Sequence, residues 1–139
     1  MGVSKSKVLL VEDSKFLRVA NERALAKAGY QVSTAADGEE ALRAASNKLP
    51  DIILLDMMLP KISGVEVLKG LKANPATVDI PVIVLTSLSQ MNEEKLLSEG
   101  AAAYFEKSTL ELDKSSDCLA DKIQAVLGRT EPAAHLSLV

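Results

Sequence analysis

The feature that most constrains the fold of this 139-residue chain is a regular alternation of two kinds of segment. Short apolar runs, each long enough for one strand, are separated by stretches whose apolar residues recur every three or four positions, as they do on one face of a helix. The runs are KVLLV (7–11), QVSTA (31–35), DIILLD (51–56), PVIVLT (81–86) and AAYFEK (102–107). This alternation predicts a parallel sheet whose strands are joined by crossover helices.

The segments between the runs carry helix signals. Ser14 can cap the first helix and Gly29 can end it. One face of that helix is expected to carry Leu17, Ala20, Ala24 and Ala28. The other predicted helices contain GEEALRAAS, GVEVLKGLK, MNEEKLLSEG and DCLADKIQAVLG. Five strands and five helices in strict alternation indicate a doubly wound α/β domain, and such sheets bind ligands at the carboxyl ends of their strands.

Composition limits the classes of partner and the compartment. The 16 basic and 19 acidic residues give a net charge of -3 without a basic stripe, so we expect no direct nucleic-acid binding. The single cysteine, Cys118, cannot form an internal disulfide. No apolar run reaches the roughly 18 residues of a membrane span, and the first residues contain no signal-peptide core. These features predict a cytoplasmic protein without a membrane segment.

The segment after Gly128 stands outside the alternating pattern. We expect one domain over residues 1–128, because this length suits a single doubly wound unit. Residues 129–139, RTEPAAHLSLV, are interpreted as a C-terminal tail or linker remnant. A docking role for this tail is the alternative.

Polar side chains stand where the predicted strands end. Glu12 and Asp13 follow the first run, and Asp56 ends the third. Thr86 ends the fourth run and Lys107 ends the fifth. Because the carboxyl ends of parallel strands meet at one edge of a sheet, these side chains are expected to converge.

Three converging carboxylates repel one another. Like charges about 4 Å apart cost about 4 kcal/mol at an effective dielectric constant near 20, so the arrangement needs a cation. Mg²⁺ suits it, because that ion takes oxygen ligands from one or two carboxylates together with waters and a phosphate. Asp56, with the metal on one side and Lys107 on the other, would be a nucleophile facing a phosphoryl donor. The alternative, that each acid is separately a strand end or helix cap, does not explain their joint position.

Five short motifs occur in a fixed order along the chain: ED, ADGEEAL and DMMLPKISG at the ends of the first three predicted strands, and PVIVLTS and AAAYFEK at the fourth and fifth. Together, over roughly residues 6–127, they resemble the receiver domain of two-component response regulators. The resemblance implies a flavodoxin-like (CheY-like) sheet with strand order 2-1-3-4-5. It also implies a signalling module rather than an enzyme, one that catalyses only its own phosphorylation and dephosphorylation.

The resemblance assigns roles at the strand ends. By it, Asp56 is the phosphoacceptor, and Mg²⁺ is held by Glu12, Asp13, Asp56 and the backbone carbonyl of Met58. Lys107 would contact the phosphoryl group. The phosphoryl source would be a phosphohistidine on a sensor histidine kinase or a histidine phosphotransfer protein.

The resemblance further implies a conformational switch. Thr86 would turn inward to bond the phosphoryl group, and Tyr104 would swing inward in step. A downstream protein partner would bind the face formed by the fourth helix, the fifth strand and the fifth helix. Without a switch, Thr86 would be an ordinary strand residue and Tyr104 a core residue with a wet hydroxyl.

One departure from the family and two rival classes stay open. Ser108 stands where the family usually has proline, and this residue directly follows Lys107, so the backbone that orients the Lys107 side chain departs from the family here. Aspartyl-nucleophile phosphatases resembling the haloacid dehalogenase group usually carry Asp-x-Asp, whereas position 58 here is methionine, so phosphate-ester turnover is expected to be negligible. A receiver-like binding module that acts without phosphorylation would lack an acid or the lysine, and only Ser108 favours it.

Overall fold

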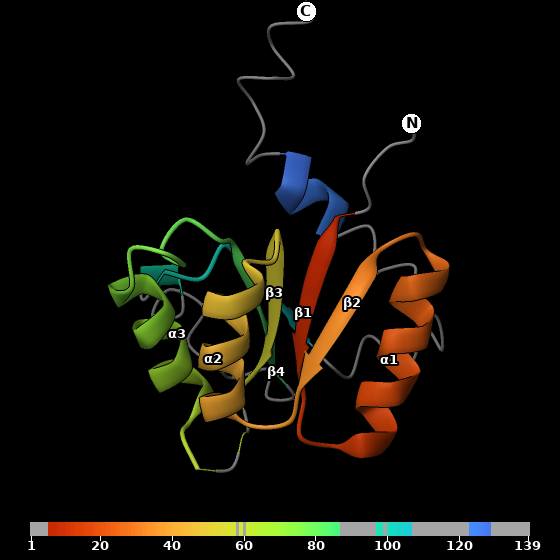
Figure 1. The fold of residues 1–139 in the computed structure, drawn as a ribbon, viewed down its shortest axis with the longest axis horizontal. Coiled ribbons are helices and arrows are strands. Elements are labelled where there is room, and N and C mark those ends of the chain that lie inside the picture. Colours follow the sequence, from red (N-terminus) through yellow and green to blue (C-terminus); the bar gives the residue numbers. More distant parts are fainter. Residues whose placement is uncertain are drawn as a thin grey trace, which may run out of the picture.

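The computed structural model describes residues 6–57, 59, 61–86, 97–98, 100–106 and 123–128, without the side chains of residues 86, 105 and 106. Strands and helices alternate from the first strand to the fourth in this part of the chain (Figure 1). The elements are β1 (Lys7–Val11), α1 (Lys15–Lys27), β2 (Gln31–Ala35), α2 (Gly38–Lys48), β3 (Ile52–Asp56), α3 (Gly64–Ala73), β4 (Val82–Thr86) and β5 (Ala103–Glu106). Residues 123–128 are also helical.

The five strands form one parallel sheet in the order β2-β1-β3-β4-β5. This order confirms the predicted doubly wound, flavodoxin-like architecture. The predicted strand boundaries hold to within one residue at each end, and those of β1 and β2 match the predicted runs. The predicted fourth helix (91–100) lies largely outside the described residues, as does the first half of the fifth (117–128), so the helix count is compared only for α1, α2, α3 and residues 123–128.

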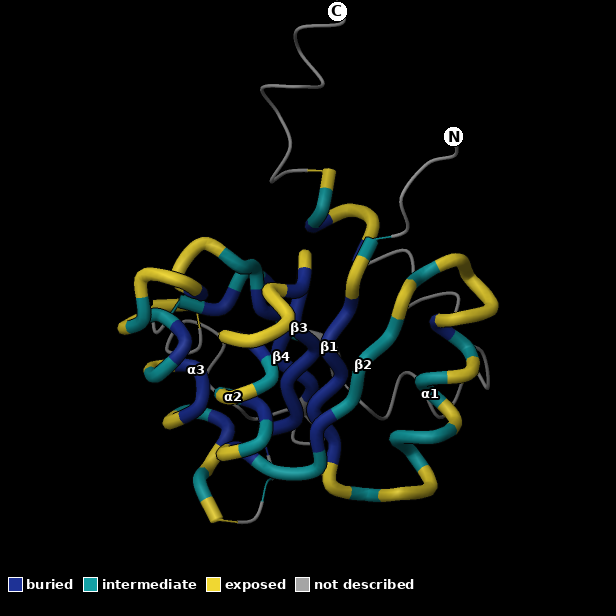
Figure 2. Tube along the Cα trace, in the orientation of Figure 1, coloured by how far each residue is buried: buried dark blue, intermediate teal, exposed yellow. Residues whose placement is uncertain are grey.

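Helices cover both faces of the sheet, and each face has its own apolar core (Figures 1 and 2). Alternate residues of each strand point to opposite faces, so β1 sends Val8 and Leu10 to one core and Leu9 and Val11 to the other. The first core is completed by α1 and the helix at 123–128, through Leu25, Ile123 and Val126. The second is completed by α2 and α3, through Ala41, Ala45, Val67, Leu68 and Leu71.

Helix α1 begins and ends as predicted but buries a different face. The Ser14 side chain accepts a hydrogen bond from the Leu17 amide, and Gly29 follows the helix with a φ of 107°. Two residues of the predicted face, Ala20 and Ala28, are exposed, whereas the buried residue of the helix is Leu25. Leucine buries more apolar surface than alanine, so the helix is rotated toward Leu25 and away from the alanine stripe.

Among the described residues, no helix has both the length and the apolar character needed to cross a bilayer.

Candidate metal and phosphoacceptor site

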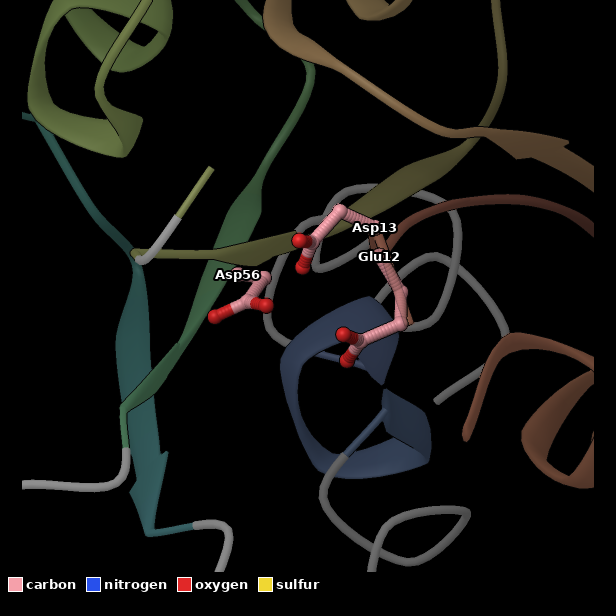
Figure 3. A group of neighbouring side chains, drawn as sticks. All are labelled: Glu12, Asp13 and Asp56. Carbon is pink, nitrogen blue, oxygen red and sulfur yellow. The ribbon is translucent and has the colours of Figure 1, made fainter. Parts of the chain in front are cut away.

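Three carboxylates meet at the carboxyl edge of the sheet (Figure 3). Glu12 and Asp13 come directly after β1, and Asp56 is the last residue of the neighbouring strand β3. The register between these strands pairs Val11 with Leu55, which brings the next residues of both strands together. One oxygen from each carboxylate lies within 4.8 Å of the others. We call Glu12, Asp13 and Asp56 the acidic cluster.

The acidic cluster combines deep burial with one open side. Glu12 and Asp56 are each 1% exposed, whereas Asp13 is exposed. Removing ionised carboxylates from water is costly unless they are paired or bind a metal. Three carboxylate oxygens at this spacing, with one ligand facing solvent, suit a hard divalent cation that keeps water or phosphate in its other positions. The donor set therefore fits Mg²⁺.

The loop that carries Glu12 and Asp13 is held by helix α1. The Arg18 guanidinium donates to the Glu12 carbonyl oxygen at 2.9 Å and, in a longer contact, to the Asp13 carbonyl oxygen at 3.5 Å. The Ser14 amide donates to Glu12 Oε2 at 3.2 Å. The first turns of α1 thus fix the backbone of both acids and one carboxylate oxygen. Arg18 was not predicted as a site residue, although its position one turn beyond the helix cap Ser14 was a usable signal.

The backbone directly after Asp56 is held by β4 and by the start of α3. The Met57 amide donates to the Leu85 carbonyl at 3.0 Å, and the Gly64 amide donates to the Met57 carbonyl at 3.2 Å. A Cβ on Gly64 would lie 2.7 Å from Met57 Cα and 2.8 Å from the Asp56 carbonyl oxygen. Only glycine allows the helix to approach this closely, so the residue predicted as a helix start also sets the packing behind Asp56.

The remaining predicted site residues are placed only in part. Thr86 is the last residue of β4, beside β3, and pairs in register with Glu106, but its side chain lies outside the described residues. Lys107, Ser108 and the proposed ligand Met58 also lie outside them. The half-buried Tyr104 packs against the core on the face covered by α2 and α3. The structure therefore brings together the three acids and leaves the proposed roles of the other residues as predictions.

Comparisons with known proteins agree with the fold and identify the family. The family model described as the response regulator receiver domain matches residues 8–114. Among curated proteins, the chain is 38% identical to the probable transcriptional regulator ycf27 of Guillardia theta, over 96% of this chain and 50% of that protein. It is 36% identical to the alkaline phosphatase synthesis transcriptional regulatory protein PhoP of Bacillus subtilis, over 94% of this chain and 52% of that protein. The chain thus spans about half the length of these relatives.

Solved structures give the same result. The chemotaxis response regulator CheY4 of Vibrio cholerae is 31% identical, with a TM-score of 0.78 over 88% of this chain and 99% of that chain. The receiver domain of the Francisella response regulator 1452 is 28% identical, with a TM-score of 0.80 over 91% of this chain and 99% of that chain. The predicted resemblance is confirmed: the chain belongs to the family of response regulator receiver domains.

Proposed function

We propose that this receiver domain accepts a phosphoryl group on Asp56 in a Mg²⁺-dependent reaction. The observation that carries the proposal is the acidic cluster, in which carboxylate oxygens from two adjacent strand ends lie within 4.8 Å of one another. Two of its carboxylates are buried, and repulsion between them favours binding of a cation. The only carboxylate supplied by β3, Asp56, is the proposed nucleophile.

In the proposed site, Glu12, Asp13, Asp56 and the backbone carbonyl of Met58 would hold the ion. Bound Mg²⁺ would offset the negative charge on the phosphoryl oxygens. A carboxylate oxygen of Asp56 attacks phosphorus, the new O–P bond forms, and the P–N bond to the donor imidazole breaks. Lys107 would stabilise charge on the transferred group.

We propose that the donor is a phosphohistidine of a sensor histidine kinase or a histidine phosphotransfer protein. Thr86 and Tyr104 would then relay the modification to a protein partner on the face formed by the fourth helix, β5 and the last helix. A partner responds only if its affinity differs between the two states of the domain. We further propose that residues 1–128 act as one cytoplasmic signalling unit, that 129–139 form a tail or linker, and that residues of this chain make no direct contact with nucleic acid or membrane.

The test is intact-mass spectrometry after incubation with Mg²⁺ and acetyl phosphate. The wild-type protein should gain one phosphoryl group, and the gain should disappear with EDTA and in Asp56→Asn. Asp51→Asn is the matched control, because Asp51 precedes the opposite end of β3, where its side chain accepts a hydrogen bond from the Lys7 amide at 2.7 Å. This control should be modified like the wild type.

Two results would contradict the proposal. Full modification of Asp56→Asn would place the phosphoryl group elsewhere. No adduct on the wild-type protein, together with no binding of beryllium fluoride, would favour the alternative of a binding module that acts without phosphorylation.

A further inference from the structure

We infer that the turn between β2 and α2 positions both segments that carry the acidic cluster. This β2–α2 turn consists of Ala36 and Asp37 together with Gly38, the first residue of α2, and none of the three belongs to the acidic cluster. The residue directly before the turn, Ala35, contacts the backbone after β1, and Gly38 contacts the loop after β3. The inference rests on the proposed function, because it assigns a positioning role for the proposed metal site.

On the β1 side, the contact is made by backbone atoms. The Glu12 amide donates to the carbonyl of Ala35, the last residue of β2, at 3.0 Å. The turn that follows is itself closed by a reciprocal pair: the Ala36 amide donates to Glu40 Oε1 at 3.0 Å, and the Glu40 amide donates to Asp37 Oδ1 at 2.8 Å. The strand end that anchors Glu12 is thus followed directly by a hydrogen-bonded turn.

On the β3 side, the contact is mainly steric. A Cβ on Gly38 would lie 3.1 Å from Ile62 Cγ1, 3.1 Å from the Ile62 carbonyl oxygen and 2.7 Å from Val67 Cγ2. The loop after β3 therefore rests directly on the backbone of Gly38. Packed atoms at these distances cannot absorb an added methyl group without moving.

An ion pair adds to this contact. Lys61 Nζ lies 3.4 Å from Asp37 Oδ2, and the Lys61 backbone is left-handed, with a φ of 69°. The Lys61 side chain is 58% exposed, and exposed ion pairs contribute little. We therefore assign the larger share of the positioning to Gly38 and Ile62 and the smaller share to the Asp37–Lys61 pair.

Movement at Ile62 reaches the acidic cluster because the loop is short and held at both ends. Its first residue, Met57, directly follows Asp56, and the residue that ends it, Gly64 at the start of α3, packs against the backbone of both. The proposed metal ligand at position 58 lies between these anchors. A displacement imposed at Gly38 is thus expected to change the geometry of the metal site as well as the local packing.

The test is to measure Mn²⁺ binding to the whole chain of the Gly38→Ala variant, with electron paramagnetic resonance as the readout. We expect the Mn²⁺ dissociation constant to rise roughly tenfold or more, as for changes in groups that orient metal ligands. The matched control is Gly70→Ala in α3, at the contact between α2 and α3. A Cβ at this position would lie 3.1 Å from Leu42 Cδ2, the flexible end of that side chain. Gly70→Ala should bind Mn²⁺ like the wild type. Thermal unfolding of each variant separates loss of stability from loss of binding.

Ile62→Ala approaches the same contact from the loop. It should also weaken Mn²⁺ binding, so the inference stays testable if Gly38→Ala does not fold. The double variant should lose less affinity than the two single losses combined, because alanine at position 62 removes the Cγ1 atom that the methyl group added at position 38 would meet, although the contacts with Val67 Cγ2 and the Ile62 carbonyl remain.

The outcomes separate the inference from the proposed function. Wild-type Mn²⁺ affinity in folded Gly38→Ala, or unchanged affinity in Ile62→Ala, would overturn the inference, as would an equal loss in Gly70→Ala. Failure of the wild-type protein itself to bind Mn²⁺ would overturn the proposed function on which the inference rests.

Discussion

Replacing Asp56 with asparagine should stabilise the protein when no metal is present. At the 4.8 Å within which the carboxylate oxygens lie, two unit charges repel by about 3.5 kcal/mol at an effective dielectric constant near 20. Asp56→Asn removes the repulsion of this carboxylate with both Glu12 and Asp13, and asparagine has nearly the same shape. The free energy of unfolding should therefore rise.

Two features make the net gain smaller than the sum of both repulsions. Asp13 is exposed, so water screens its repulsion with Asp56, and the Asp56 side chain has other interactions that an amide reproduces only in part. We expect a net gain of about 1–3 kcal/mol in the free energy of unfolding. For a domain of this size that gain corresponds to a rise in Tm of about 3–10 °C.

The assay is urea unfolding monitored by circular dichroism, first in EDTA and then in the presence of Mg²⁺. Mg²⁺ at ten times its Kd should stabilise the wild-type protein by about 1.4 kcal/mol, and it should stabilise Asp56→Asn less. Asp51→Asn should show no gain in EDTA, because Asp51 lies away from the acidic cluster and accepts its hydrogen bond from the Lys7 amide at the opposite end of β3. Asp56→Asn that is no more stable than the wild type in EDTA would refute the reasoning, since the acidic cluster would then carry no net repulsion.

Three further predictions concern groups around the site and the α3–β4 connection. Arg18→Met should weaken Mn²⁺ binding and lower the free energy of unfolding by about 1–2 kcal/mol, because it removes the donor to the Glu12 carbonyl; unchanged binding in calorimetry would contradict this. Lys72→Met should speed amide hydrogen exchange over residues 74–80, because the Lys72 ammonium donates hydrogen bonds to the carbonyls of Val78 and Ile80 at 3.0 and 2.9 Å. Burial of the ammonium also lowers the pKa of Lys72 below 10.5, although the charge of Asp79 acts in the opposite direction. A measured pKa of Lys72 at or above 10.5 would contradict this effect of burial. The hydrogen bond from the Glu40 amide, helped by Lys61, holds the pKa of Asp37 below 3.8. The stabilising effect of the Asp37 carboxylate is therefore complete above pH 3.8 and is lost as the pH falls through the lowered pKa. Urea titrations should show that the difference in unfolding free energy between the wild type and Asp37→Asn, which retains a capping side chain, closes in that acidic range, and a constant difference would contradict the assignment.

The strands were predictable because their signal is local. Nearly continuous runs of Val, Ile and Leu mark β1, β3 and β4 as buried on both faces, and the first residues after such strands must meet at one edge of a parallel sheet. That rule alone predicts that Glu12, Asp13 and Asp56 lie close together, and their carboxylates do meet.

The contacts behind the acidic cluster were not predictable in the same way. Whether Gly38 supports Ile62, or Arg18 reaches the Glu12 carbonyl, depends on how closely two elements pack. The spacing of apolar residues along the sequence does not determine that packing distance. The rotation of α1 toward Leu25 has the same origin, because a stripe of alanines defines a helix face only weakly.

The most direct test of the central claim is to locate the phosphoryl group on the wild-type chain. After incubation with acetyl phosphate and Mg²⁺, borohydride reduction converts a phosphorylated aspartate to homoserine, which peptide sequencing by mass spectrometry can place. The proposed chemistry predicts homoserine at position 56 alone, and its loss when Mg²⁺ is removed. Homoserine at Asp13 or Asp51 instead, or at position 56 with equal yield in EDTA, would contradict a metal-dependent phosphoacceptor at Asp56.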